Sequence, residues 1–175
     1  MYDIDVVAFA KSFATDRHTG QVRKYTGAPY ITHPAAVARY VRMVGGSAEM
    51  IAAAWMHDLI EDTGTTRHDI ADRFGQQISW MVFDLTDRSL YAMDQLPRRE
   101  RKRLDADALS RCSGDVQTVK MADLLDNSRS IIAFDPKFAK VYIREAEYLV
   151  EVLIRAEQRI TSAVKSVISY YRRNF

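Results

Sequence analysis

Apolar residues recur at intervals of three and four positions along most of this chain, which is the spacing of an amphipathic helix. In the first half the pattern predicts helices over residues 3–18, 34–44 and 47–62. A polar stretch over residues 19–32, rich in glycine and proline, separates the first two and predicts a loop. Ser47 is a favourable N-cap for the third helix.

The second half of the chain continues the helical pattern. It predicts a helix ending at residue 74 before a glycine, a loop over 87–96, and further helices over 76–86, from 97, over 115–134 and from 137 onward. The last segment is too long for a typical single helix, so a bend or two packed helices are expected. No useful β-alternation is present. The sequence therefore predicts one all-α domain, a helical bundle spanning residues 1–175.

Four titratable residues gather on one side of the predicted helix 47–62. They are His57, Asp58, Glu61 and Asp62. At about 100° per residue they occupy an arc of about 140°, and residues three or four apart are neighbours on a helix. Burying so many polar groups beside an apolar run is costly. Chemistry is the expected reason for this arrangement.

A His beside an Asp can supply two ligands to a divalent cation, and two further residues can complete the set. His33 opens a predicted helix, and Asp123 lies on another. Two imidazoles with two carboxylates leave positions open in an octahedral shell. This donor set favours one Mn²⁺ over a closed zinc site, and Zn²⁺ and Fe²⁺ stay open as less favoured metals.

Composition limits the classes of function. Hydrophobic residues make up 47% and charged residues 27%, and the net charge is +2, so no general affinity for nucleic acid or membranes is expected. The single cysteine, Cys112, excludes an intrachain disulfide and favours a reducing compartment. Acidic residues near the N-terminus and the lack of a long apolar run argue against a signal peptide or a membrane span. A cytoplasmic protein is expected.

Four motifs occur in a fixed order. They are Arg23-Lys24, Gly27-Ala28-Pro29-Tyr30-Ile31-Thr32-His33-Pro34, His57-Asp58-Leu59-Ile60-Glu61-Asp62-Thr63, and Val119-Lys120-Met121-Ala122-Asp123 with Asn127. The order His, His-Asp, Asp resembles the HD superfamily of metal-dependent phosphohydrolases. Together the motifs resemble the (p)ppGpp hydrolase domain of RelA/SpoT homologues. Without a synthetase domain, the chain is similar to stand-alone small alarmone hydrolases, and residues 96–104 resemble the SpoT-like hydrolases of animals.

The resemblance implies a role for each matching residue. The positions of His33, His57, Asp58 and Asp123 hold Mn²⁺ in that family, in agreement with the donor set above. Glu61 and Asp62 match the pair that orients or deprotonates the attacking water, and the sequence leaves open which of them is the base.

Substrate contacts are implied in the same way. Arg23 and Lys24 match residues that meet the guanine base and the phosphates, and Asn127 matches one near the ribose or 3′-phosphate. Arg98 is at the position of a basic residue that reaches the 5′-diphosphate in the animal enzymes, with Arg144 and Tyr148 as the other half of that subsite. Taken alone, these charges also fit ordinary solvated side chains. His18 fits a packing or supporting role better than metal ligation.

The implied activity is a manganese-dependent 3′-pyrophosphohydrolase that converts ppGpp to GDP and pppGpp to GTP. Leu124, Leu125 and Asp126 depart from the family pattern before Asn127, which makes (p)ppApp an alternative substrate. A nucleotidase acting on dNTPs or NADPH and a non-catalytic alarmone-binding or antitoxin-like protein are two more functions that the sequence leaves open. Aromatic residues near the C-terminus are expected in the core or in a homodimer interface: Tyr170, Tyr171 and Phe175.

Overall fold

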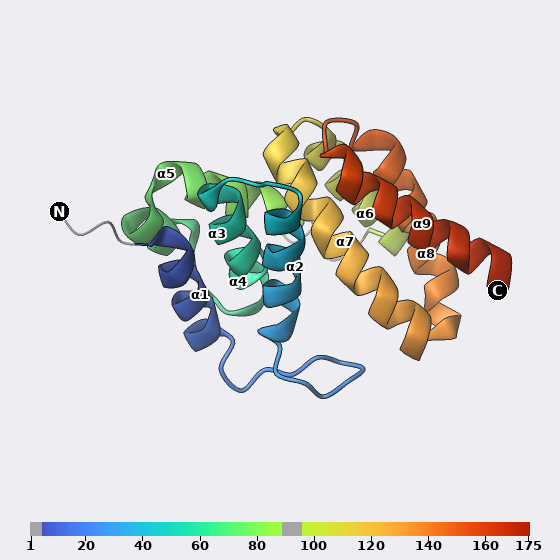
Figure 1. The fold of residues 1–175 in the computed structure, drawn as a ribbon, viewed down its shortest axis with the longest axis horizontal. Coiled ribbons are helices and arrows are strands. Elements are labelled where there is room, and N and C mark those ends of the chain that lie inside the picture. The colour runs from blue at the N-terminus through green and yellow to red at the C-terminus, as the bar shows by residue number, and fades with distance from the viewer. Residues whose placement is uncertain (1–4, 89–95) are drawn as a thin grey trace. The chain divides into compact units, whose positions relative to one another are not determined.

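The computed structural model describes residues 5–88 and 96–175, so the predicted loop at 87–96 lies mostly outside the described residues (Figure 1). These residues form the helices α1 to α9, and no strand occurs among them. The prediction of an all-α protein is confirmed. The helices form two compact units, residues 1–86 and 87–175.

The first unit is built around one apolar helix. Its helices are α1 (Val6–Arg17), α2 (Thr32–Met43), α3 (Ala48–Met56), α4 (Leu59–Asp62) and α5 (Arg67–Leu85). Helix α3 contacts α1, α2 and α5, and all of its residues from Met50 to Met56 are buried. A helix that is apolar on every side is stable only when neighbours surround it. It therefore forms the core of this unit and leads directly into His57.

Several predicted boundaries in the first unit are confirmed. Ser47 caps α3, its side chain accepting a hydrogen bond from the backbone N–H of Met50. The break predicted before Gly75 is present within α5, where Gly75 has a φ of 82°. Helix α1 begins only at Val6, later than the predicted start at residue 3, because the side chain of Asp5 caps it there.

The prediction of one continuous helix over residues 47–62 is wrong. Helix α3 ends at Met56, a turn follows at His57 and Asp58, and α4 has only four residues. The interruption occurs where the buried apolar run ends and the polar pair His57-Asp58 begins. The backbone N–H of Asp62 still donates to the carbonyl of Asp58 over 2.9 Å. One helical turn therefore still links the His-Asp pair to the acid pair.

The second unit contains α6 (Arg98–Ser110), α7 (Gly114–Phe134), α8 (Pro136–Val152) and α9 (Gln158–Asn174). Helix α7 contacts α6, α8 and α9, and α8 contacts α6 and α9. The expected division of the C-terminal segment is confirmed, with the break over residues 153–157. Buried Gln117 accepts a hydrogen bond from the backbone N–H of Arg155 over 2.9 Å, and Thr118 accepts one from Glu157 over 2.9 Å. These bonds fix the break without glycine or proline.

None of the helices described is both long and apolar enough to cross a membrane. Cys112 follows α6 as a half-buried free thiol, and its Sγ lies 3.4 Å from the carbonyl oxygen of Ala108.

Candidate active site

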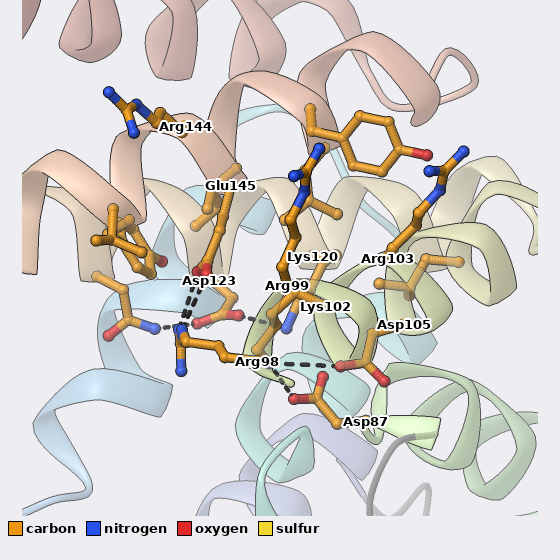
Figure 2. A pocket seen from close by; sticks show the side chains of 17 residues that line it. Asp87, Arg98, Arg99, Lys102, Arg103, Asp105, Lys120, Asp123, Arg144 and Glu145 are labelled. Carbon is orange, nitrogen blue, oxygen red and sulfur yellow. Dashed lines mark hydrogen bonds and ion pairs between the residues drawn. The ribbon is translucent and has the colours of Figure 1, made fainter. Parts of the chain in front are cut away.

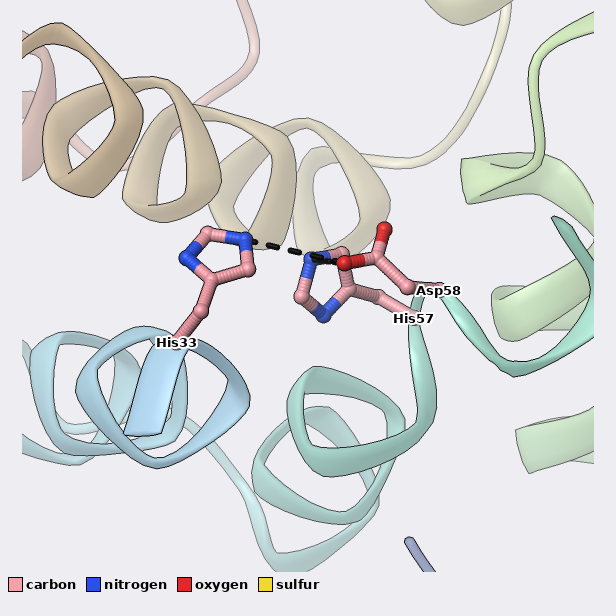
Figure 3. Close-up of side chains that lie close together, drawn as sticks. All are labelled: His33, His57 and Asp58. Carbon is pink, nitrogen blue, oxygen red and sulfur yellow. Dashed lines mark ion pairs between the residues drawn. The ribbon is translucent and has the colours of Figure 1, made fainter. Parts of the chain in front are cut away.

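Three of the four predicted metal ligands lie together in the first unit. His33, His57 and Asp58 each offer a ligand atom, and these atoms lie within 4.8 Å of one another (Figure 3). One Asp58 carboxylate oxygen is 3.1 Å from His57 Nε2 and 3.6 Å from His33 Nε2. Both histidines are buried, at 2% and 3% exposure. The structure thus brings together residues of two predicted motifs, and their binding of a metal remains a prediction.

Neighbouring groups set the orientation of these ligands. His57 Nδ1 lies 2.9 Å from the carbonyl oxygen of Ala54. Because a carbonyl oxygen only accepts, Nδ1 carries the proton, and Nε2 faces Asp58. The hydroxyl of Tyr30 donates to the same Asp58 oxygen over 2.7 Å. Such supporting bonds fix the orientation of metal ligands and tune their basicity.

The cluster fits a divalent cation. In the neutral form of His57, Nε2 and the Asp58 carboxylate are both acceptors at 3.1 Å, an arrangement that a cation between them satisfies. Imidazole nitrogen and carboxylate oxygen together suit Mn²⁺, Fe²⁺ or Zn²⁺. The structure thus supports a metal site at His33, His57 and Asp58, in agreement with the predicted donor set.

The fourth predicted ligand, Asp123, lies on α7 in the second unit. It is buried, at 6% exposure. One of its oxygens accepts a hydrogen bond from Asn127 over 2.6 Å, and the other forms an ion pair with Lys120 at 2.9 Å. Each carboxylate oxygen retains a second lone pair. Its ligation of the same cation remains a prediction.

The predicted acid pair lies on α4, one turn after the His-Asp pair. Glu61 is half-buried, and Asp62 is exposed as a residue. Protein atoms around the Asp62 carboxylate, together with the nearby Asp58 carboxylate, raise its pKa above the ordinary value; Tyr30 and the charges of His18 and His57 oppose the rise. A carboxylate with a raised pKa is a stronger base.

Arg23 and Lys24 lie in the loop between α1 and α2. This loop folds back on itself: the backbone N–H of Arg23 donates to Ala28 over 2.8 Å, and Gly27 supplies a positive φ of 66°. Arg23 is half-buried. Lys24 is exposed, with its Nζ 5.0 Å from the centre of the Tyr25 ring. The loop holds two adjacent cations, and their contact with a nucleotide remains a prediction.

The other predicted substrate residues line a cavity of about 930 Å³ within the second unit, between α6, α7 and α8 (Figure 2). This volume lies in the range of small-molecule sites. Its lining includes Asn127, Arg98, Arg144 and Tyr148. The structure therefore gathers these four residues around one cavity, although they come from three helices.

Arg98 already has an anionic partner in this cavity. Its Nε and one terminal nitrogen donate to the two oxygens of Glu145, each over 2.9 Å, and its guanidinium lies 5.0 Å from the centre of the Phe138 ring. Figure 2 shows this two-bond contact. Arg144 is exposed, and the Tyr148 hydroxyl donates to Asp107 over 3.2 Å. A nucleotide phosphate would compete with Glu145 for Arg98.

Sequence reasoning missed two residues that support these sites. Tyr30 was part of a motif, but its bond to Asp58 depends on the path of an irregular loop. Glu145 gave no signal as the partner of Arg98, because the two lie far apart in sequence on α8 and α6. Both contacts are tertiary, and no local spacing predicts them.

Comparison with known proteins places the chain in a family. The HD domain profile matches residues 10–149. The guanosine-3′,5′-bis(diphosphate) 3′-pyrophosphohydrolase MESH1 of Xenopus tropicalis is 37% identical over 138 residues, which cover 77% of this chain and 74% of that protein. MESH1 of Mus musculus is 32% identical over 166 residues, 90% of each chain.

A solved structure gives the same fold. It is that of a metazoan orthologue of SpoT, which hydrolyses ppGpp; it aligns with a TM-score of 0.85 at 24% identity and covers 99% of this chain and 98% of that one. The predicted resemblance and the HD-type helical bundle are confirmed. The chain therefore belongs to the HD domain family and is a relative of the MESH1-type 3′-pyrophosphohydrolases.

Proposed function

We propose that this protein is a metal-dependent 3′-pyrophosphohydrolase of guanosine alarmones, which cleaves ppGpp to GDP and pyrophosphate, and pppGpp to GTP and pyrophosphate. The observation that carries the proposal is the buried His33-His57-Asp58 cluster in a chain 37% identical to a curated enzyme of that name. Without the cluster, the likeness alone would also fit a binding protein that had lost catalysis.

The metal is proposed to be Mn²⁺, held by His33, His57, Asp58 and Asp123. When bound, such a cation supplies Lewis acidity to the phosphoryl group and lowers the pKa of water. The carbonyl of Ala54 and the hydroxyl of Tyr30 orient His57 and Asp58 as ligands.

Glu61 and Asp62 are proposed to take the proton of the attacking water. They follow Asp58 by one helical turn, and the environment of Asp62 raises the pKa of its carboxyl group. Both features suit a general base beside a metal ligand.

Cationic side chains are proposed to hold the substrate. Arg23 is placed at the guanine base, Lys24 at the phosphates, and Asn127 at the ribose or 3′-phosphate. Arg98, Arg144 and Tyr148 are assigned to the 5′-diphosphate, supported by their shared cavity in the second unit. An Arg plane can stack on a purine, while Lys offers a point charge to phosphate.

We further propose that residues 1–175 act as a single HD-type domain, because the matched residues 10–149 run through both compact units. A cytoplasmic location is proposed, consistent with one free cysteine. A homodimer is a further proposal, supported by the exposure of Phe175 and Tyr170, at 72% and 53%, whereas Tyr171 is buried. Light scattering in solution tests it.

The function is tested by incubating the purified protein with Mn²⁺ and, separately, ppGpp, pppGpp, ppApp, dGTP and NADPH, followed by chromatography of the products. The proposal expects GDP or GTP with pyrophosphate from the guanosine alarmones, and loss of turnover after chelation. Exclusive turnover of ppApp would fit the departure at Asp126 and move the assignment to adenine alarmones. Binding of ppGpp without any product would favour a non-catalytic binding protein.

A further inference from the structure

His18 is a buried titratable residue for which the proposed chemistry gives no role. It caps the C-terminal end of α1, and it is only 3% exposed. A polar ring is costly to bury unless its nitrogens form useful bonds. The contacts of the His18 ring should therefore indicate why a histidine is buried at this position.

One ring nitrogen of His18 has a partner. Nδ1 lies 2.7 Å from Oε1 of Gln21. The other nitrogen, Nε2, is buried and meets no hydrogen-bond partner among the described residues. The bond to Gln21 is thus the polar interaction that accounts for an imidazole at this position.

The orientation of Gln21 follows from its second contact. Its Nε2 donates to the backbone carbonyl of Asp62 over 2.9 Å, and a carbonyl oxygen can only accept. The amide oxygen of Gln21 therefore faces His18, and His18 Nδ1 must carry the proton. The tautomer of His18 thus follows from its hydrogen-bond partner.

The same turn supports the metal site. The His18 ring packs against Tyr30 with 4.8 Å between ring centres, and Tyr30 in turn donates to Asp58. The backbone N–H of Tyr30 donates to the carbonyl of Gln21 over 2.9 Å. His18 lies near enough to Asp62 for its charge to affect the pKa of that carboxyl group.

We infer that His18 is a positioning residue for the acid pair: its Nδ1–H orients Gln21, and Gln21 holds the main chain of Asp62 at the end of α4. A four-residue helix has few internal bonds, so an external bond to the carbonyl of its last residue restrains the main chain that carries Glu61 and Asp62. The inference rests on the proposed function for its kinetic effect, whereas the bonds themselves can be tested without catalysis.

Two substitutions separate the two contacts of His18. His18→Phe keeps a ring against Tyr30 and removes the donor. His18→Asn removes the ring and keeps an N–H donor at the position of Nδ1, since both atoms are bonded to Cγ. Gln21→Glu retains an acceptor for His18 and removes the donor to Asp62. Exposed His68 on α5, with 81% of its side chain accessible, provides the matched control His68→Phe.

The expected result is a kcat lower by about 10- to 100-fold in His18→Phe and Gln21→Glu, the range found for groups that orient active-site ligands. KM and Mn²⁺ affinity should change by less than about threefold, because neither variant removes a ligand. His18→Asn should retain most of the wild-type kcat, and His68→Phe all of it. Equal loss in His18→Asn and His18→Phe, or wild-type kcat in His18→Phe, would overturn the inference.

Two measurements are independent of turnover. Nitrogen-15 NMR of the neutral protein should show His18 protonated at Nδ1, and hydrogen exchange should be faster across residues 59–63 in His18→Phe and Gln21→Glu than in the wild type. A protonated Nε2 with a bare Nδ1, or unchanged exchange in both variants, would refute the bond network. If the wild type hydrolysed no nucleotide, the proposed function would fail, and these two measurements would still decide the inference.

Discussion

The two compact units use polar side chains in different ways. In the first, His33 and His57 are buried, and a bond to the backbone carbonyl of Ala54 orients His57. In the second, the cavity is lined by long charged side chains, and Arg98 is exposed while bound to Glu145. A fixed cluster suits a reaction centre, whereas paired surface charges can exchange one anion for another. Under the proposed function, the first unit would hold most of the metal ligands and the acid pair, and the cavity of the second unit would hold the 5′-diphosphate.

The cavity of the second unit is also rich in charged side chains. The cavity of the second unit has six cationic and four acidic lining residues: Arg98, Arg99, Lys102, Arg103, Lys120 and Arg144 against Asp87, Asp105, Asp123 and Glu145. Lys102 pairs with Asp87 and Asp105, and Lys120 with Asp123. The lining acids thus pair with three of the six cations, so affinity for a polyanion depends on which pairs open.

The largest expected effect concerns the cluster itself. Asp58→Ala removes the carboxylate that lies near both histidines, so bound metal and turnover should be lost together. Metal content by atomic emission and product chromatography provide the measurement. Retention of pyrophosphate release at the wild-type rate would show that the first unit is not the reaction centre, and the contrast between the units would fail.

The acid pair should separate metal binding from catalysis. Glu61→Gln and Asp62→Asn keep the shape of each side chain and remove the base, so the variant that lacks the true base should lose about 10²- to 10⁴-fold in kcat. Metal content should stay at the wild-type level in both. Equal activity of both variants with the wild type would exclude a general-base role for this turn.

Tyr30→Phe tests the support of Asp58. It deletes only the hydroxyl that donates to the carboxylate over 2.7 Å, and it leaves the ring against His18. Loss of such a supporting bond costs about 10- to 100-fold in metal affinity or activity. Titration with Mn²⁺ should show the loss. Tyr25→Phe, in the same loop, is the matched control, and an equal loss there would indicate a general effect on the loop.

The sequence anticipated that His33, His57 and Asp58 lie close together, because two of them follow local rules. The apolar run before His57 forms a buried helix, and that helix delivers His57 and Asp58 to the interior of the unit. Helical spacing then brings Asp62 one turn beyond Asp58, even though a turn at His57 and Asp58 separates α3 from α4. Motif order and local periodicity were sufficient to predict that these residues lie near one another.

Fewer contacts of the second unit could be predicted from the sequence. The sequence predicted Arg98 on a basic helix after Pro97, which is correct. It did not predict that Glu145 forms an ion pair with the guanidinium of Arg98. That pair joins residues far apart in sequence, and long side chains have many rotamers. Likewise, the end of the helix at Met56 was missed: His57 and Asp58 keep αR backbone angles, and the bond from Tyr30 to Asp58 is a tertiary contact that local spacing does not predict.

Glu145→Gln tests whether the cavity of the second unit binds the substrate through Arg98. The variant weakens a two-bond ion pair, frees Arg98 and adds one positive charge to the cavity. KM for ppGpp should fall by about three- to fivefold with kcat unchanged, since an exposed pair contributes up to about 1 kcal/mol. Steady-state kinetics at two salt concentrations provide the measurement. In an Arg98→Ala background the effect should disappear; its persistence there would show that Glu145 does not act through Arg98.

The smallest effect tests whether exposed pairs in the second unit matter for stability. Arg172 lowers the pKa of Glu147 below its ordinary value of 4.5. A lowered pKa in the folded state means that the pair adds stability above the unfolded value, and that this contribution is lost as pH falls through the folded value. Arg172→Met should therefore unfold slightly more easily than the wild type at pH 7, with the difference closing in acid. Urea unfolding across this pH range measures it, with Arg173→Met as the neighbouring control. Both partners are solvent-accessible, so the expected difference in unfolding free energy is small. A large or pH-independent difference would mean that Arg172 stabilises α9 by packing its aliphatic stem. The surface charges of the second unit would then contribute less to its stability than the ion pair predicts.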